Sequence, residues 1–83
     1  MKIYDYNGTA NICGRKIREV RERKNFSQEQ FAAKLQVEGV NLTQKAISRI
    51  ETGKRVVADY ELLAASRVLG VTLDWLLSGI ISV

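Results

Sequence analysis

Two closely spaced helix-start signals constrain this chain more than any other feature of its sequence. Ser27 opens the stretch SQEQ, a capping-box pattern in which the hydroxyl accepts a backbone N–H and the glutamine three positions on reaches back. Thr43 then stands before a second short stretch, residues 44–52, which ends at Gly53. Because both starts are specified locally, residues 28–38 and 44–52 are predicted to be two successive helices.

The second of these helices has two unlike faces. At about 100° per residue, Ala46, Ile47 and Ile50 share one side, and polar side chains fill the other. A helix of about nine residues is ~13 Å long, comparable to the ~12 Å width of the DNA major groove. This pattern favours a helix-turn-helix whose second helix reads bases, and the side chains predicted to contact base edges are Gln44, Lys45, Ser48 and Arg49.

A further group of residues flanks this reading helix and is predicted to contact phosphate. The amino end of a helix exposes N–H groups that bind phosphate oxygens, and basic side chains just after Gly53 would neutralise a phosphate on the other flank. The predicted phosphate contacts are Ser27, Gln28, Thr43, Lys54 and Arg55.

Three more helices are predicted, over about residues 12–24, 59–70 and 73–77. Asn11 is expected to cap the helix over residues 12–24. Ala58, which precedes the helix over residues 59–70, offers no capping hydroxyl. The apolar positions of all five helices predict a shared core that consists of Cys13, Ile17, Val20, Phe31, Ala32, Leu35, Ile47, Ile50, Leu62, Leu63, Leu69 and Leu76.

A chain of 83 residues without repeats or linkers is expected to form one domain. We expect an N-terminal arm over residues 1–10, a helix-turn-helix domain over 11–78 and an apolar tail over 79–83. Within the arm, Tyr4 and Tyr6 are expected to pack on the core, with an arm that reaches DNA as the alternative. The C-terminal end carries more apolar surface than so small a core buries, which predicts a two-fold dimer contact through Trp75, Leu77, Ile80 and Ile81.

Composition narrows the classes of function. The chain has no histidine and one cysteine, and it lacks clustered carboxylates and a phosphate-cradling glycine loop. We therefore expect no enzyme, no metal, no cofactor and no small-molecule ligand. The absence of a secretory signal and of a long apolar run predicts a cytoplasmic protein that does not enter a membrane.

Charge is distributed unevenly along the chain. Residues 15–55 hold eleven Lys and Arg against five Asp and Glu, whereas the other residues carry a net charge of −2, and the whole chain carries +4. A basic half beside an acidic one indicates a polyanionic partner on one side of the molecule. An ordinary solvated charged face is the alternative interpretation.

Three segments of the chain resemble a known family. RKIREVRERKNFSQEQFAAKL, TQKAISRIETGKR and LGVTLDWLL are similar to the lambda-repressor-like, XRE/Cro-type helix-turn-helix transcriptional regulators, over roughly residues 12–77. The resemblance implies a five-helix all-α domain, a double-stranded DNA operator as partner and a homodimer. By position, it also implies that Gln28 and Gln44 contact DNA and that Arg21 forms an internal ion pair with Glu51.

One feature departs from the family pattern. Eight residues separate Leu35 from Gln44, where a tight turn leaves about three or four. An extra helical turn ended by Gly39 would absorb some of them, and Val40 and Leu42 would then be tucked beneath the loop. The angle at which the reading helix docks is therefore less well defined by the sequence than the identity of that helix.

The predicted function is a sequence-specific DNA-binding transcriptional regulator of the repressor type. Its operator would be roughly palindromic, with half-sites about one helical turn, ~34 Å, apart. The alternative is a protein-interaction module of the same fold, such as an antitoxin or an anti-repressor.

Overall fold

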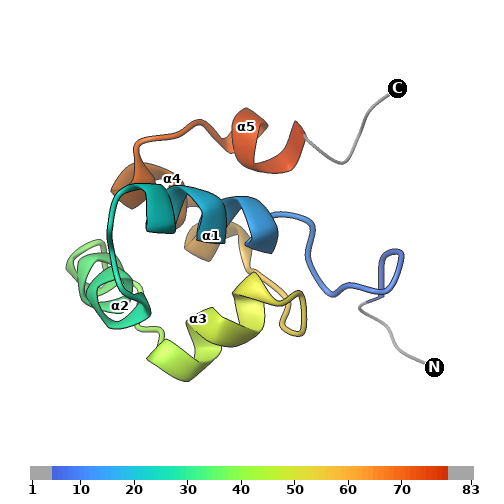
Figure 1. Cartoon of the computed structure of the whole chain (residues 1–83), viewed down its shortest axis with the longest axis horizontal. Coiled ribbons are helices and arrows are strands. Elements are labelled where there is room, and N and C mark those ends of the chain that lie inside the picture. The colour runs from blue at the N-terminus through green and yellow to red at the C-terminus, as the bar shows by residue number, and fades with distance from the viewer. Residues whose placement is uncertain (1–4, 79–83) are drawn as a thin grey trace.

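Between residues 5 and 78 the chain folds into five short α-helices (Figure 1). The computed structural model describes residues 5–78. In chain order the helices are α1 (Gly14–Arg23), α2 (Gln28–Val37), α3 (Gln44–Glu51), α4 (Asp59–Leu69) and α5 (Leu73–Ser78). No strand is formed within residues 5–78, so the predicted all-α fold of five helices is confirmed. None of the helices described there is long and apolar enough to cross a membrane.

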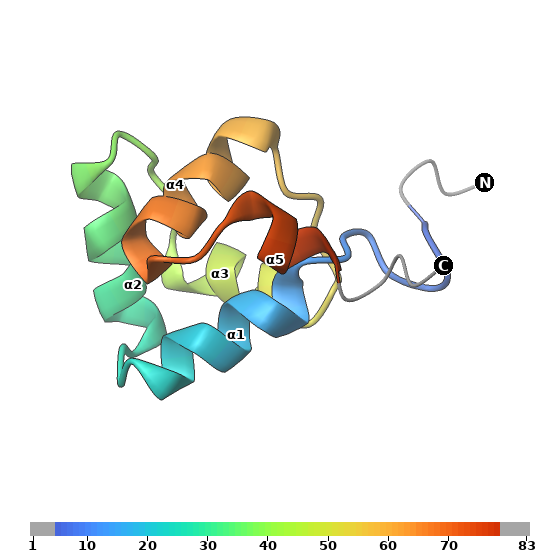
Figure 2. The same ribbon diagram turned by 90° about the horizontal axis from the view of Figure 1, so that it is seen from above.

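The helices enclose the core and leave α3 at one edge of the molecule. Figure 1 shows α3 along the lower edge and α5 along the upper edge, with α1 and α4 between them. α3 packs against α1 and α2, whereas α4 packs against α1, α2 and α5. In the view from above, α2 closes one end and the N-terminal segment lies at the other (Figure 2). One side of α3 is therefore left without a covering element.

The two helix starts predicted from the sequence are present as hydrogen bonds. Ser27 Oγ accepts from the Gln30 N–H at 3.0 Å, and Gln30 Oε1 accepts from the Ser27 N–H at 2.8 Å. Thr43 Oγ1 accepts from the Ala46 N–H at 3.0 Å. Such caps are each worth about 1 kcal/mol, and they depend only on neighbours in the sequence. This local origin explains why the starts of α2 and α3 were predicted to the residue.

A Schellman motif ends α2 and shapes the long connection to α3. Gly39 adopts a φ of +87°, and its N–H donates to Gln36 O at 2.9 Å. The Val40 N–H donates to Leu35 O at 3.0 Å. Val40 is buried and Leu42 packs partly buried against the core. The additional residues of this connection are thus folded onto the core, as expected.

The starts of α1 and α4 lack the hydroxyl caps of α2 and α3, and only the α1 start differs from the prediction. α1 begins at Gly14 rather than directly after Asn11, although Asn11 Oδ1 accepts from the Gly14 N–H at 2.7 Å. Ala58 cannot cap α4, and Glu61 instead reaches back to accept from the Ala58 N–H at 2.9 Å. α4 therefore begins with one half of a capping box.

One apolar core joins the helices, and most of its members were predicted. The prediction that Leu63 is buried is wrong, because its side chain is 39% exposed while Ala64 and Ala65 face inward. Ala32 and Leu62 are only partly buried. The buried apolar residues are Cys13, Ile17, Val20, Phe31, Leu35, Val40, Ile47, Ile50, Ala64, Ala65, Leu69 and Leu76.

The N-terminal segment forms a small turn beside the end of α3. The Tyr6 and Thr9 backbones bond to each other, and the Ala10 N–H donates to Gly53 O at 2.7 Å. The expectation that Tyr6 packs on the core is wrong, since this side chain is 52% exposed. Tyr4 lies outside the described residues.

Candidate nucleic-acid interface

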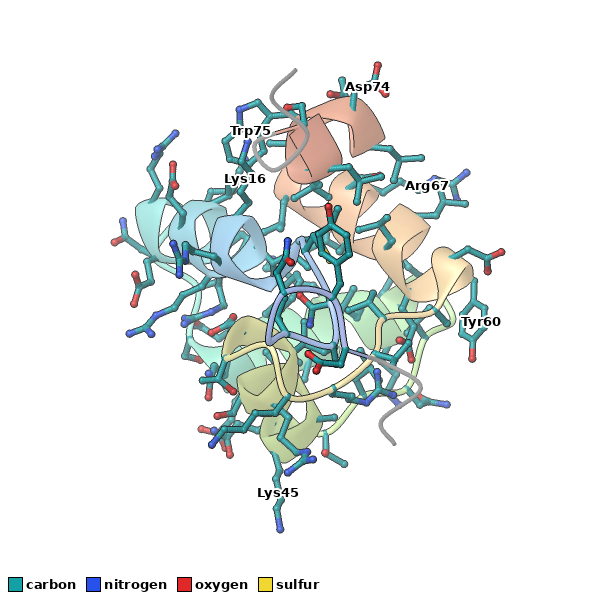
Figure 3. All side chains as sticks on the ribbon, turned by 90° about the vertical axis from the view of Figure 1, so that its right-hand side faces the viewer. Lys16, Lys45, Tyr60, Arg67, Asp74 and Trp75 are labelled. Atoms are coloured by element: carbon teal, nitrogen blue, oxygen red, sulfur yellow. The ribbon has the colours of Figure 1, made fainter. Side chains whose placement is uncertain are left out.

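α3 presents its polar side to solvent and its apolar side to the core. Ile47 and Ile50 are 1% and 4% exposed. Lys45 projects away from the body of the protein, below the α3 ribbon in the view of Figure 3. All four side chains predicted to contact bases reach this surface: Gln44, Lys45 and Arg49 are exposed, and Ser48 is half-buried.

The positive charges of this surface are not neutralised by the part of the chain that the structure describes. Lys45, Arg49 and Lys54 are exposed, and none of them forms an ion pair with another residue of the range 5–78. Lys54 directly follows Gly53, which turns the chain at the end of α3 with a φ of +77°. Three cations are thus available to an anionic partner along one side of α3.

A buried ion pair holds α3 to α1. Arg21 Nε donates to Glu51 Oε2 at 2.6 Å and Nη2 donates to Glu51 Oε1 at 3.0 Å, with the two side chains 9% and 2% exposed. Arg21 Nη1 also donates to Phe26 O at 2.7 Å. The hydrogen bonds to Glu51 raise the pKa of Arg21, against the opposite effect of burial. The ion pair that the family resemblance implied is therefore formed, in the bidentate geometry that tolerates burial.

Hydrogen bonds continue from this ion pair to the start of α3. Gln28 Nε2 donates to Glu51 Oε1 at 3.1 Å, and Gln44 Nε2 donates to Gln28 Oε1. The first residue of α2 is thereby tied to both the first and the last residue of α3. The amino ends of α2 and α3 consequently lie side by side, where each contributes a positive helix terminus.

Of the residues predicted to contact phosphate, three are exposed to solvent, whereas Gln28 is half-buried. Ser27 and Thr43 are exposed, and each hydroxyl oxygen already accepts a helix N–H, which leaves its O–H able to donate to another group. Lys54 is exposed at the opposite end of α3. These groups bracket the reading helix from both ends.

Arg55 has a different setting from that predicted. Its guanidinium donates to Glu61 Oε1 and Oε2 at 2.9 and 3.1 Å and to Val56 O at 2.8 Å. A phosphate would have to displace the Glu61 carboxylate, so this geometry argues against Arg55 as a phosphate contact. Burial alone would raise the pKa of Glu61, but hydrogen bonds from Arg55 and the Ala58 N–H outweigh it and lower that pKa.

One residue that touches α3 was missed by the sequence reasoning. Asn11 was expected only to cap α1, yet its Nδ2 also donates to Ile50 O and Arg55 O. No local pattern indicates a side-chain contact to backbone that far along the chain, so only tertiary structure reveals it.

The predicted dimer residues that the structure describes lie on α5, which α1 and α4 separate from α3 (Figure 1). Trp75 and Leu77 are half-buried on α5, and Ile80 and Ile81 lie outside the described residues. Lys16 Nζ sits 4.4 Å from the centre of the Trp75 ring and donates to Trp75 O at 2.9 Å (Figure 3). Part of the apolar surface expected to be open is thus covered by an α1 side chain.

The part of the chain that the structure describes holds no group of three or more His, Cys, Asp or Glu residues placed to bind a metal ion. Cys13 is buried, and burial raises the pKa of its thiol to about 11, partly opposed by a backbone hydrogen bond. The thiol is therefore protonated at neutral pH and unsuited to act as a nucleophile.

Comparison with known proteins agrees with this geometry. A helix-turn-helix family model matches residues 17–76, a span that begins within α1 and ends within α5. No curated protein matches the sequence. The family is one of DNA-binding domains that are typically non-catalytic. With α2 and α3 arranged as the two helices of the motif, the chain belongs to the XRE/Cro-type helix-turn-helix family.

Proposed function

We propose that this protein is a sequence-specific transcriptional regulator of the repressor type, which inserts α3 into the major groove of an operator. The observation that carries the proposal is the outer side of α3. This side combines exposed polar side chains with cations that pair with no acidic residue between positions 5 and 78, while the Arg21–Glu51 pair and Gln28 hold the helix itself in place. A rigid helix with a free polar face is the arrangement that base reading requires.

Base contacts would come from the amino-terminal half of α3. Lys45 and Arg49 suit the O6 and N7 acceptors of guanine, and Gln44 suits the N6 and N7 groups of adenine. Ser48 is less selective. Such helices enter the groove with their amino end first, so Gln44 and Lys45 lie nearest the bases and Arg49 reaches a base or a phosphate.

Phosphate contacts would fix the orientation of the domain on the duplex. Ser27, Gln28 and Thr43 stand at the adjoining amino ends of α2 and α3, where N–H groups are available to phosphate oxygens. Lys54 would contact the strand on the other side of the groove. Arg55 is left out of this set because Glu61 occupies its guanidinium.

We further propose that the protein acts in the cytoplasm as a homodimer on a roughly palindromic site. Partly exposed apolar side chains of α5 support this proposal, together with the apolar composition of residues 79–83. Trp75 and Leu77 would contribute to the contact, with Ile80 and Ile81 added from the tail. Because α1 and α4 lie between α5 and α3 in Figure 1, a contact through α5 leaves the reading helix uncovered.

Selection of bound duplexes from a random pool, followed by titration with salt, tests the proposal. We expect a recurrent, two-fold symmetric sequence and a steep logarithmic dependence of affinity on salt. Gln44→Ala should relax the preference at one base position, whereas Lys54→Ala should weaken all duplexes alike. Weak binding without sequence preference, unchanged by Gln44→Ala, would favour a protein-interaction module of the antitoxin or anti-repressor type.

A further inference from the structure

We propose that Asn11 is a positioning residue for DNA recognition, which fixes the carboxyl end of α3 and the Lys54 turn that follows it. The effect of Asn11 on DNA binding rests on the proposed function, whereas its effect on the α3 turn concerns the free protein alone. Asn11 lies outside both helices of the motif and beyond the residues matched by the family model.

The Asn11 side chain uses both of its amide protons and its carbonyl oxygen. Nδ2 donates to Ile50 O at 2.9 Å and to Arg55 O at 2.8 Å, and Oδ1 accepts from the Gly14 N–H at 2.7 Å. Ile50 belongs to α3, Gly14 begins α1, and Arg55 lies in the loop after α3. One partly buried side chain therefore joins three separate segments of backbone.

The contact between α1 and α3 at this point is unusually close. A Cβ atom added to Gly14 would lie 2.0 Å from Ile50 O and 2.8 Å from Asn11 Oδ1, so no other residue fits there without displacing the backbone. This proximity brings the Ile50 carbonyl within reach of a side chain as short as asparagine.

The two carbonyls that Asn11 binds stand on either side of Lys54. Ile50 precedes the turn at Gly53, and Arg55 follows Lys54 directly. The Ala10 N–H donates to Gly53 O at 2.7 Å, and Thr9 Oγ1, whose closer acceptor is Asn11 O at 2.7 Å, lies 3.2 Å from the same Gly53 oxygen. Residues 9–11 thus clamp the turn that presents Lys54, directly after Glu51, the last α3 residue, which Arg21 and Gln28 hold.

Other short polar side chains cannot make this set of bonds. Aspartate keeps the acceptor for the Gly14 N–H but would place a carboxylate against two carbonyl oxygens. Serine has a single donor and can satisfy one carbonyl at most. Asparagine is therefore specifically suited to this place. The substitutions Asn11→Asp and Asn11→Ser remove different numbers of its hydrogen bonds.

The test compares wild type, Asn11→Asp and Asn11→Ser by hydrogen exchange in the free protein and by affinity for a selected and a scrambled duplex. We expect faster exchange of the Lys54 and Gly53 amides in both variants. For Asn11→Ser we expect about a tenfold loss of affinity for the selected duplex and a smaller loss, about twofold to threefold, for the scrambled duplex, because the displaced Lys54 turn contributes a phosphate contact to both. A misplaced helix loses base contacts, whereas most of the unspecific phosphate binding survives.

The acidity of the new carboxyl supplies a second readout. A carboxylate between carbonyls has a raised pKa in the folded protein, so Asn11→Asp should bind worst at about pH 7.5 and recover as the carboxyl is protonated towards about pH 5. Asn11 lines a recess together with Arg15, Lys16 and Glu51, and Lys54 and Arg55 lie on the adjoining turn. These groups are also present in the wild type, so only the difference between the two proteins reports on residue 11.

Gln36→Glu is the matched control for charge, because it makes the same amide-to-carboxylate change on an exposed α2 side chain. Unchanged amide exchange and wild-type discrimination in both Asn11 variants would overturn the inference. So would an equal loss of affinity for both duplexes. If wild type selects no duplex while the variants still exchange faster, the clamp stands and its role in recognition is overturned together with the proposed function.

Discussion

α1 and α3 both carry basic side chains on their outer faces, but they dispose of the charge differently. On α1, Arg18 pairs with Glu22 at 3.3 Å and Arg23 pairs with Glu19 at 2.6 Å. On α3, Lys45 and Arg49 have no acidic partner within residues 5–78. The one acidic residue of α3, Glu51, faces inward to Arg21.

The difference shows where the net charge of the chain acts. Carboxylates one turn away neutralise Arg18 and Arg23, so these two arginines contribute little field at a distant anion. The free cations of α3 and the adjoining turn gather on one side, where phosphate groups could replace their bound water and counterions. The net charge of residues 15–55 does not distinguish neutralised cations from free ones, because the basic residues of both helices contribute to it.

The largest expected effect comes from the ion pair that joins the two helices. Glu51→Ala leaves Arg21 buried without its partner and should lower the free energy of unfolding by about 3–5 kcal/mol. Urea denaturation followed by circular dichroism measures the change. Glu19→Ala is the matched control, since it also removes the partner of an arginine but on the exposed side of α1, and it should cost about 0.5 kcal/mol or less. Equal losses in the two variants would refute the structural role of the buried pair.

The next effect concerns the free cations of α3. Arg49→Ala or Lys45→Ala should lower affinity for the selected duplex by about tenfold or more, equivalent to roughly 1–3 kcal/mol, because a base-edge contact is lost. Arg23→Ala removes the same charge from α1 and should change affinity by less than about twofold, since Glu19 already neutralises that arginine. Fluorescence anisotropy at fixed salt measures the affinity of each variant. A comparable loss of affinity in Arg23→Ala would place the duplex on α1 instead.

A smaller effect follows from the other internal pair, Arg55–Glu61. The pKa of Glu61 is lowered in the folded protein, so its contribution to stability is present above the ordinary glutamate pKa and disappears as the pH falls through the lowered value. Glu61→Gln should cost roughly 1–2 kcal/mol at neutral pH and should flatten the loss of stability in acid. Thermal unfolding between about pH 7 and pH 3 measures both. An acid profile identical to that of wild type would contradict this role of Glu61.

The smallest effect belongs to a single phosphate contact. Lys54→Ala should weaken binding to every duplex by a few-fold and reduce the slope of log affinity against log salt by about 0.9. Lys34→Ala is the control, because it removes another exposed lysine, this one from α2, where the Lys34 ammonium lies over the Phe26 ring. A change of sequence preference in Lys54→Ala would instead assign this lysine to base reading.

Local sequence signals and tertiary contacts contributed different parts of this structure. The capping bonds of Ser27 and Thr43 and the stop at Gly39 involve residues within a few positions, so the starts of α2 and α3 could be read directly. Helical periodicity also predicted most of the core. It failed at Leu63, because periodicity ranks an apolar residue by its spacing and cannot tell which neighbouring helix covers it.

The site was predictable in its outline but not in its connections. The polar face of α3 follows from the spacing of Gln44, Lys45, Ser48 and Arg49, whereas the engagement of Arg55 by Glu61 depends on how the loop folds back onto α4. Arginine near a reading helix suits phosphate or carboxylate equally well, because both accept the same fork of donors.

The sequence by itself determined that two capped helices follow one another and that the second has a polar side, since caps and periodicity act over a few residues. Only the tertiary structure decided which polar groups remain free. Asn11 spans three segments because the fold brings backbone from some forty positions away to its side chain. Arg55 is occupied because the loop folds back onto Glu61 at the start of α4. A pattern of neighbouring residues encodes neither arrangement.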